Sequence, residues 1–202
     1  MKEKSDWRQR LRENRAVAEA KEKLENDKVR YVMRLLFEIA VTLAFAALVA
    51  IVMFQSVTMQ ESAMEPTISV GDKFFMNRAV YQLSDPKRGD IIVFKTNASD
   101  DAALHIRRII GLPGETIQIS GGQILIDGKT YREGKDFPAI SNPGAAQNPI
   151  TLESNEYFVL GDNRNNSEDS RYGDIGMVKK RYIVGKLWFT VSPMKKFGFM
   201  KG

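Results

Sequence analysis

The stretch on which the organisation of this chain depends reads Glu61-Ser62-Ala63-Met64-Glu65-Pro66-Thr67. It lies a few residues after a long apolar run, where a membrane helix would emerge into water. Three later segments are predicted to surround it: residues 88–94, 104–114 and 161–173. The stretch therefore predicts a functional site built close to a membrane surface.

The apolar run covers residues 35–54, and Glu38 is its one charged residue. A helix of twenty residues is about 30 Å long, which matches the hydrocarbon core of a bilayer. A cleavable signal peptide is disfavoured because such peptides have apolar regions of about 7 to 15 residues and a short charged flank. A buried core helix is disfavoured because a soluble helix would show a polar stripe. We therefore predict a single membrane anchor.

The flank before the run is basic and rich in good helix formers. Residues 1–34 hold eleven Lys/Arg and seven Asp/Glu. Because positive flanks stay in the cytoplasm, we expect a single-pass plasma-membrane protein whose N-terminus is cytoplasmic and whose main domain is extracellular. The expected organisation is a cytoplasmic arm (residues 1–34), an anchor (residues 35–54) and an outer domain (residues 55–202).

Composition excludes several kinds of site. The chain has no cysteine and one histidine, His105, so it has no disulfide, no thiolate ligand and no multi-histidine centre. Its net charge is +5, but the basic residues are not interleaved with aromatic ones as in nucleic-acid modules. We therefore expect no metal, no cofactor and no nucleic-acid partner.

After Gln55 the sequence changes to short β-type runs broken by Gly, Pro, Asn and Asp. The predicted strands cover residues 73–77, 90–95, 104–110, 116–119, 123–126, 157–160 and 181–191. Gly121-Gly122 and Asp127-Gly128 are hairpin signals, whereas residues 132–150 follow neither period and are predicted to form a long exposed loop. The predicted fold class is mostly β, with Greek-key or barrel-like closure favoured over βαβ units.

Four motifs resemble the sequence boxes of type I signal peptidases, which are serine peptidases with a Ser/Lys dyad. They are Ala-Met-Glu-Pro-Thr at residues 63–67 with Gly-Asp at 71–72, Arg-Gly-Asp-Ile-Ile-Val-Phe at 88–94, His-Ile-Arg-Arg-Ile-Ile-Gly-Leu-Pro-Gly-Glu at 105–115, and Gly-Asp-Asn-Arg-Asn-Asn-Ser-Glu-Asp-Ser-Arg-Tyr-Gly at 161–173. They follow the family order after one anchor. The stretch between the last two boxes is short, which resembles Gram-positive members of the family and not those Gram-negative members that carry a large second domain there.

The resemblance implies a single transmembrane helix followed by a β-rich signal-peptidase-type domain. It implies a membrane serine endopeptidase that removes signal peptides from exported preproteins after a small-x-small sequence. Its partners would be those signal peptides and membrane lipid. In such an enzyme a lysine acts as the base because burial against apolar surface lowers its pKa.

Two positions depart from that chemistry. The family's nucleophilic serine falls on Ala63, and its general-base lysine falls on Arg107. Alanine has no nucleophilic atom, and arginine stays protonated at any useful pH, so the chain is expected to be catalytically inactive. The remaining matches imply that Ser167 orients the base, that Asp169 and Arg171 form a structural ion pair, and that Met64 and Pro66 line the substrate groove.

Ser62 and His105 offer a different pair. If residues 62–63 are extended, Ser62 points to the opposite face from Ala63 and away from position 107. His105 would share the strand face of Arg107. A surface or core histidine and a loop hydroxyl are the simpler interpretations of these two residues.

Two functions remain open on the sequence. The first is a signal peptidase disabled at its dyad, by laboratory substitution or by natural loss. The second is a non-catalytic relative, a membrane scaffold or chaperone that binds exported or surface-fibre proteins in the same groove.

Overall fold

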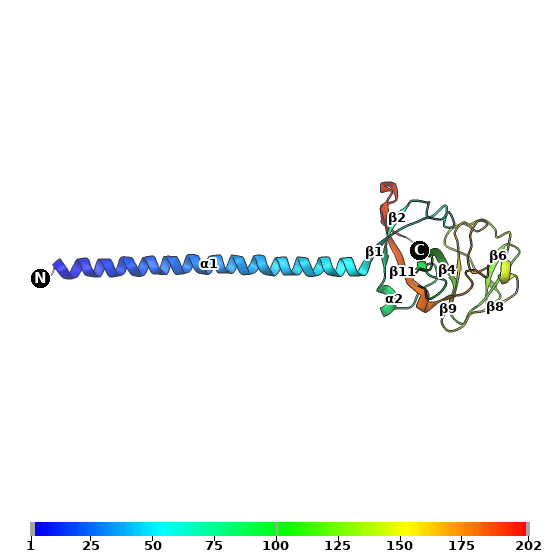
Figure 1. Cartoon of the computed structure of the whole chain (residues 1–202), viewed down its shortest axis with the longest axis horizontal. Helices are drawn as coiled ribbons and strands as arrows, with labels where there is room; N and C mark the ends of the chain where they lie inside the picture. The colour runs from blue at the N-terminus through cyan, green and yellow to red at the C-terminus, as the bar shows by residue number, and fades with distance from the viewer. Residues whose placement is uncertain (1–2, 100, 201–202) are drawn as a thin grey trace. The chain divides into compact units, whose positions relative to one another are not determined.

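The computed structural model describes residues 3–99 and 101–200 (Figure 1). The chain divides into two compact units, Met1–Ile51 and Val52–Gly202. The described part of the first unit belongs to helix α1 (Glu3–Met53), whose last two residues fall in the second. The second unit also holds the short helix α2 (Val80–Leu83), the described strands, and the 3₁₀ helices η1 (Gly144–Gln147), η2 (Lys180–Tyr182) and η3 (Met194–Lys196).

Helix α1 is continuous across the predicted boundary between arm and anchor. Its sequence contains neither proline nor glycine, so no residue in it breaks the helical hydrogen bonds. At the boundary, Arg34 Nε lies 3.1 Å from Glu38 Oε1, one helical turn away. The segment Asn14–Leu48 is long and apolar enough to cross a membrane, and the side chains of its apolar part are not buried.

The β unit contains an eight-stranded sheet in the order β1-β2-β11-β3-β4-β9-β10, with β12 paired to β11. Its strands are β1 (Phe54–Thr58), β2 (Lys73–Asn77), β3 (Ile91–Phe94), β4 (His105–Gly111), β9 (Glu156–Leu160), β10 (Val178–Lys179), β11 (Ile183–Ser192) and β12 (Gly198–Phe199). A smaller sheet, β7-β6-β5-β8, consists of β5 (Thr116–Ser120), β6 (Gln123–Ile126), β7 (Lys129–Thr130) and β8 (Ile150–Thr151). Figure 1 shows β2 and β11 on one side of this unit and β6 and β8 on the other.

The predicted β-rich fold is confirmed. Every strand pair described is antiparallel, as expected for a domain without βαβ crossovers. Both predicted hairpins form: Ser120 pairs with Gln123, and Ile126 pairs with Lys129.

Two details differ from the sequence prediction. Phe54, assigned to the anchor, is the first residue of β1 and pairs with Asn77. The segment 132–150 is irregular but not exposed throughout, because Ile140 and Ala146 pack into the core beside the small sheet. Burial of a few apolar side chains is enough to hold a segment that has no periodic pattern.

The join between the two sheets is packed around Gly111 at the end of β4. A Cβ atom there would lie 2.8 Å from side-chain atoms of Ile117, Leu152 and Phe158. Non-bonded carbon atoms essentially never come this close, so any side chain at position 111 would force the neighbouring core side chains apart.

We predict that Gly111→Ala lowers the free energy of unfolding by about 1–3 kcal/mol, the usual cost of overpacking. Gly173→Ala is the matched control, because its Cβ would meet nothing within 4 Å. Chemical denaturation of the full chain in detergent micelles compares the two. Equal stability of both variants would contradict the packing described.

Candidate active site

The segment that carries positions 61–63 is held between two buried methionines. Met59 and Met64 are 2% and 0% exposed. Met59 N donates to Asp72 O at 2.9 Å, and Gly71 N donates to Met59 O at 2.9 Å. Glu65 N donates to Ser62 O at 3.1 Å, so the chain turns here. The extended geometry assumed for residues 62–63 is therefore not found.

A cavity of about 570 Å³ opens at this turn. Residues from the turn, from β4 and from the loop after β9 meet around it. Its lining comprises Glu61, Ser62, Ala63, Arg107, Asn165, Asn166, Ser167, Glu168, Tyr172 and Asp174. Positions 63, 107 and 167, far apart in the sequence, thus share one cavity.

Arg107 is held by three neighbours. Its side chain is 1% exposed. Nε donates to Glu168 O at 2.6 Å, Nη1 to Ile106 O at 2.8 Å, and Nη2 to Glu61 Oε2 at 2.8 Å. Donors on all three nitrogens are engaged, and guanidinium does not deprotonate in proteins, so Arg107 cannot accept a proton.

Glu61 provides the negative charge opposite Arg107. His105 Nδ1 lies 3.4 Å from Glu61 Oε1, and Arg107 contacts the other oxygen. His105 and then Arg107 lower the pKa of Glu61 to about 2 from 4.5, although partial burial acts in the opposite direction. Glu61 is therefore ionised at every physiological pH. His105 and Arg107 reach it from alternate residues of one strand, and so from the same face of β4.

The depressed pKa of Glu61 makes stability depend on pH. Its contribution is complete above the ordinary pKa of 4.5 and is lost as the pH falls toward about 2. We predict that Glu61→Gln destabilises the chain at pH 7, and that the difference from the unaltered chain narrows between pH 4.5 and 2. Denaturant titrations across this range measure it. Glu168→Gln is the control, because its side chain is exposed and takes no part; a gap that stays constant with pH would contradict the pairing.

Gly161 lies where two segments of the cavity wall cross. A Cβ atom on it would be 2.1 Å from Ser167 Oγ and 2.4 Å from Ala63 O. Asn163 secures the crossing, because its backbone N donates to Ala63 O at 3.0 Å and its side chain donates to Ser62 O at 3.2 Å. Glycine is required here by close approach, and the absent side chain is what brings Ser167 next to Ala63.

Asp169 and Arg171 form a buried bidentate pair. Arg171 Nε donates to Asp169 Oδ1 and Nη2 to Oδ2, each at 2.8 Å, with side chains 0–1% exposed. Asp169 Oδ2 also accepts from Gly161 N at 3.1 Å, and Arg171 Nη1 donates to Asn142 O at 3.0 Å. The pair thus links the Gly161 crossing to the loop before η1.

We predict that Asp169→Asn costs about 3–5 kcal/mol of stability, because it leaves the Arg171 charge buried and unpaired. Asp174→Asn, at an exposed position of the same loop, should change stability little. Thermal unfolding of the two variants separates the effects. A loss below about 1 kcal/mol for Asp169→Asn would be the value of a surface pair and would contradict the burial.

The other predicted site residues lie in different surroundings. Met64 packs in the hydrophobic core, and Pro66 is exposed and is not among the residues that line the cavity. Ser62 does line it, and its Oγ accepts from Asn166 Nδ2 at 3.5 Å. His105 is engaged with Glu61, and its ring lies 5.8 Å from that of Phe94.

Sequence reasoning missed Glu61 and Asn163 as site residues. A signal for Glu61 existed: the resemblance places Arg107 where the family buries its lysine, a buried arginine requires a counter-charge, and Glu61 lies two residues before position 63. The role of Asn163 depends on its bonds to Ser62 and Ala63 where the two segments cross, and no local sequence pattern predicts that crossing. In the described residues no group of three or more His, Cys, Asp or Glu is placed to hold a metal ion.

Comparison with known proteins identifies relatives of this chain. Residues 32–192 match the family model described as signal peptidase, peptidase S26. A probable signal peptidase I-2 of Synechocystis is 36% identical over 143 residues, covering 69% of this chain and 63% of the relative. A signal peptidase I of Bacillus amyloliquefaciens is 34% identical over 167 residues, covering 78% and 86%. A crystal structure of a signal peptidase I from Enterococcus faecalis V583 aligns with a TM-score of 0.42 and 32% identity, covering 52% of this chain and 97% of that one.

Proposed function

Because this chain belongs to the signal peptidase family, peptidase S26, we propose that it binds the signal peptides of exported preproteins at the Ala63/Arg107 cavity without cutting them through a Ser/Lys dyad. This proposal gives the site residues the roles that the motifs imply. The nucleophile and base positions are Ala63 and Arg107, the residue that supports the base position is Ser167, and the structural ion pair is Asp169–Arg171. The chain spans 63% of the length of its Synechocystis relative, so the complete activity of that protein is not carried over.

The state of Arg107 supports this proposal most strongly. A catalytic base must be able to lose and regain a proton, yet Arg107 remains cationic and is bonded to two carbonyl oxygens and to Glu61. Ala63, which lines the same cavity, supplies only a methyl group. Shape and hydrogen-bonding groups of the cavity remain available for a peptide, whereas the attacking atom and the base are missing.

A second candidate is a membrane scaffold or chaperone for exported or surface-fibre proteins. The observation that favours it is the Glu61 counter-charge. A lysine next to an ionised carboxylate is held in its charged form, so Glu61 suits an arginine at position 107 better than a general base. The chain around position 107 is thus adapted to a permanent cation.

We also assign the β unit to a membrane surface, with residues 1–34 in the cytoplasm. The apolar part of α1 supports the anchor, and the basic flank supports its orientation. The β unit carries exposed aromatic side chains near its C-terminal end: Phe197 and Phe199 are 57% and 74% exposed, and their rings pack edge-on against Phe189. Such a cluster suits contact with lipid.

Restoring the dyad tests the function. Ala63→Ser/Arg107→Lys supplies both missing groups, but Glu61 then pairs with the introduced lysine and keeps it protonated. We predict that the unaltered chain does not cleave a preprotein at an Ala-x-Ala junction and that the double variant cleaves it weakly. Adding Glu61→Gln should speed cleavage at least about tenfold, because lowering the pKa of the lysine by one unit raises its unprotonated fraction about tenfold.

The control is Ala63→Ser alone, purified identically, which has a nucleophile but no base and should be inactive. Cleavage by the unaltered chain above this control would refute the proposal. If the triple variant folds and binds a fluorescent signal peptide without cutting it, the scaffold function is favoured.

A further inference from the structure

A second cavity lies away from the Ala63/Arg107 site. It has a volume of about 1310 Å³. Four cations from three separate segments line it: Arg78 after β2, Lys95 after β3, and Lys180 and Arg181 in η2. None of the described residues that line it is acidic. We call it the basic pocket.

The charge of the basic pocket is only partly neutralised. Lys180 Nζ lies 2.6 Å from Asp85 Oδ1, and Arg181 rests over the ring of Tyr182 at 4.9 Å. Lys95 Nζ donates to Ser99 O at 3.0 Å, among its interactions. Among residues 3–99 and 101–200, no carboxylate forms an ion pair with Arg78. Gathered cations raise the local potential and attract an anion, most strongly at Arg78, where no described carboxylate offsets the charge.

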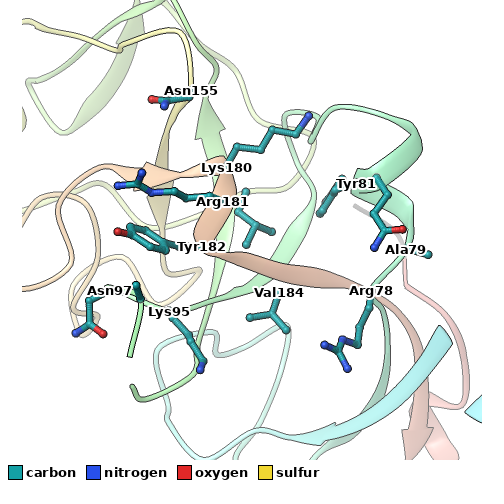
Figure 2. A pocket seen from close by; sticks show the side chains of 13 residues that line it. Arg78, Ala79, Tyr81, Lys95, Asn97, Asn155, Lys180, Arg181, Tyr182 and Val184 are labelled. Carbon is teal, nitrogen blue, oxygen red and sulfur yellow. The ribbon is translucent and has the colours of Figure 1, made fainter. Parts of the chain in front are cut away.

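The pocket also has an apolar floor. Figure 2 shows Val184 between Arg78 and Lys95, which come from different segments, with Tyr81 and Tyr182 farther to either side. Tyr81 Oη donates to Asp90 Oδ2 at 2.9 Å, so this ring is fixed by its far end. A ligand that fits has a negative charge next to a less polar part, as a phosphodiester on glycerol has.

The register of the sheet places Arg78 close to Phe54, the residue that follows α1. Phe54, the residue that follows α1, pairs with Asn77, the neighbour of Arg78. Paired Cα atoms are about 4.5–5.5 Å apart and consecutive ones about 3.8 Å, so Arg78 lies within about 10 Å of the chain's exit from the helix. The headgroup layer is about 5–8 Å deep on each side of the hydrocarbon.

We propose that the basic pocket binds the phosphate headgroup of an anionic phospholipid from the membrane in which the anchor lies. Arg78 and Lys95 bind the phosphate, and the surface around Val184 receives the glycerol part. Guanidinium and ammonium groups are the usual phosphate donors in proteins. The proposal rests on the membrane placement proposed above, but not on the chemistry at Ala63 and Arg107.

The test uses the full chain in uncharged detergent micelles, titrated with short-chain phosphatidylglycerol and, separately, with short-chain phosphatidylcholine. Bound lipid is counted by native mass spectrometry. We expect phosphatidylglycerol to bind at least about tenfold more tightly, the value of one charge-assisted hydrogen bond. Arg78→Gln/Lys95→Gln should remove this preference, and Arg78→Gln alone should reduce it, which keeps the test valid if the double variant does not fold.

The matched control is Lys129→Gln/Arg132→Gln, which removes the same charge from exposed positions outside the pocket. It should bind phosphatidylglycerol normally. An equal loss in the control would show attraction by net charge alone and would overturn the proposal. So would equal affinity for the two lipids, or displacement of phosphatidylglycerol by equimolar inorganic phosphate or by a short acidic peptide. None of these outcomes bears on preprotein binding, which the fluorescent signal peptide measures separately.

Discussion

The ion pair between Arg107 and Glu61 is the interaction on which the candidate site depends. A guanidinium that is 1% exposed is tolerated only if its charge is compensated and its donors are satisfied. Glu61 supplies the charge, and two backbone carbonyls complete the set. Since Glu61 belongs to the turn beside Ala63 and the Glu168 carbonyl belongs to the loop after β9, Arg107 joins three parts of the cavity wall. Arg107 is therefore the structural centre of this cavity wall.

A second buried arginine fixes the cavity wall from the opposite face of β4. Arg108, the next residue, is also buried, and it makes a bidentate pair with Asp162 at 2.8 and 2.7 Å. Successive residues of a strand point to opposite faces, so the two arginines secure two different layers. Both bind the segment around Gly161, Arg108 through Asp162 and Arg107 through Glu168. The position of Ser167 against Ala63 is therefore set by charges from both sides of one strand.

Local patterns predicted most strands and both hairpins, because alternation and two-residue turn signals are encoded in adjacent residues. The membrane-helix candidate was predicted for the same reason, since length and apolarity are local. The continuity of α1 was missed: composition changes at residue 34, but nothing there breaks a helix. The turn at Ser62 was also missed, because it depends on the burial of Met59 and Met64 and on bonds to the distant Asp72 and Gly71. The motif resemblance predicted that positions 63, 107 and 167 lie together. The role of Glu61 could not be predicted in this way, because it depends on contacts with His105 and Arg107 that only the folded chain forms.

The distinction between a lost enzyme and a binding module concerns electrostatics more than missing atoms. A lysine base works when its surroundings are apolar, since desolvation lowers its pKa, and a carboxylate beside it has the opposite effect. Here the environment has been set for a permanent cation, with His105 and Arg107 both keeping Glu61 ionised. Replacement of one side chain at position 107 would leave that environment in place. Because the guanidinium of Arg107 is 1% exposed and all three of its nitrogens are engaged, its fixed positive charge holds the cavity wall together and does not move a proton.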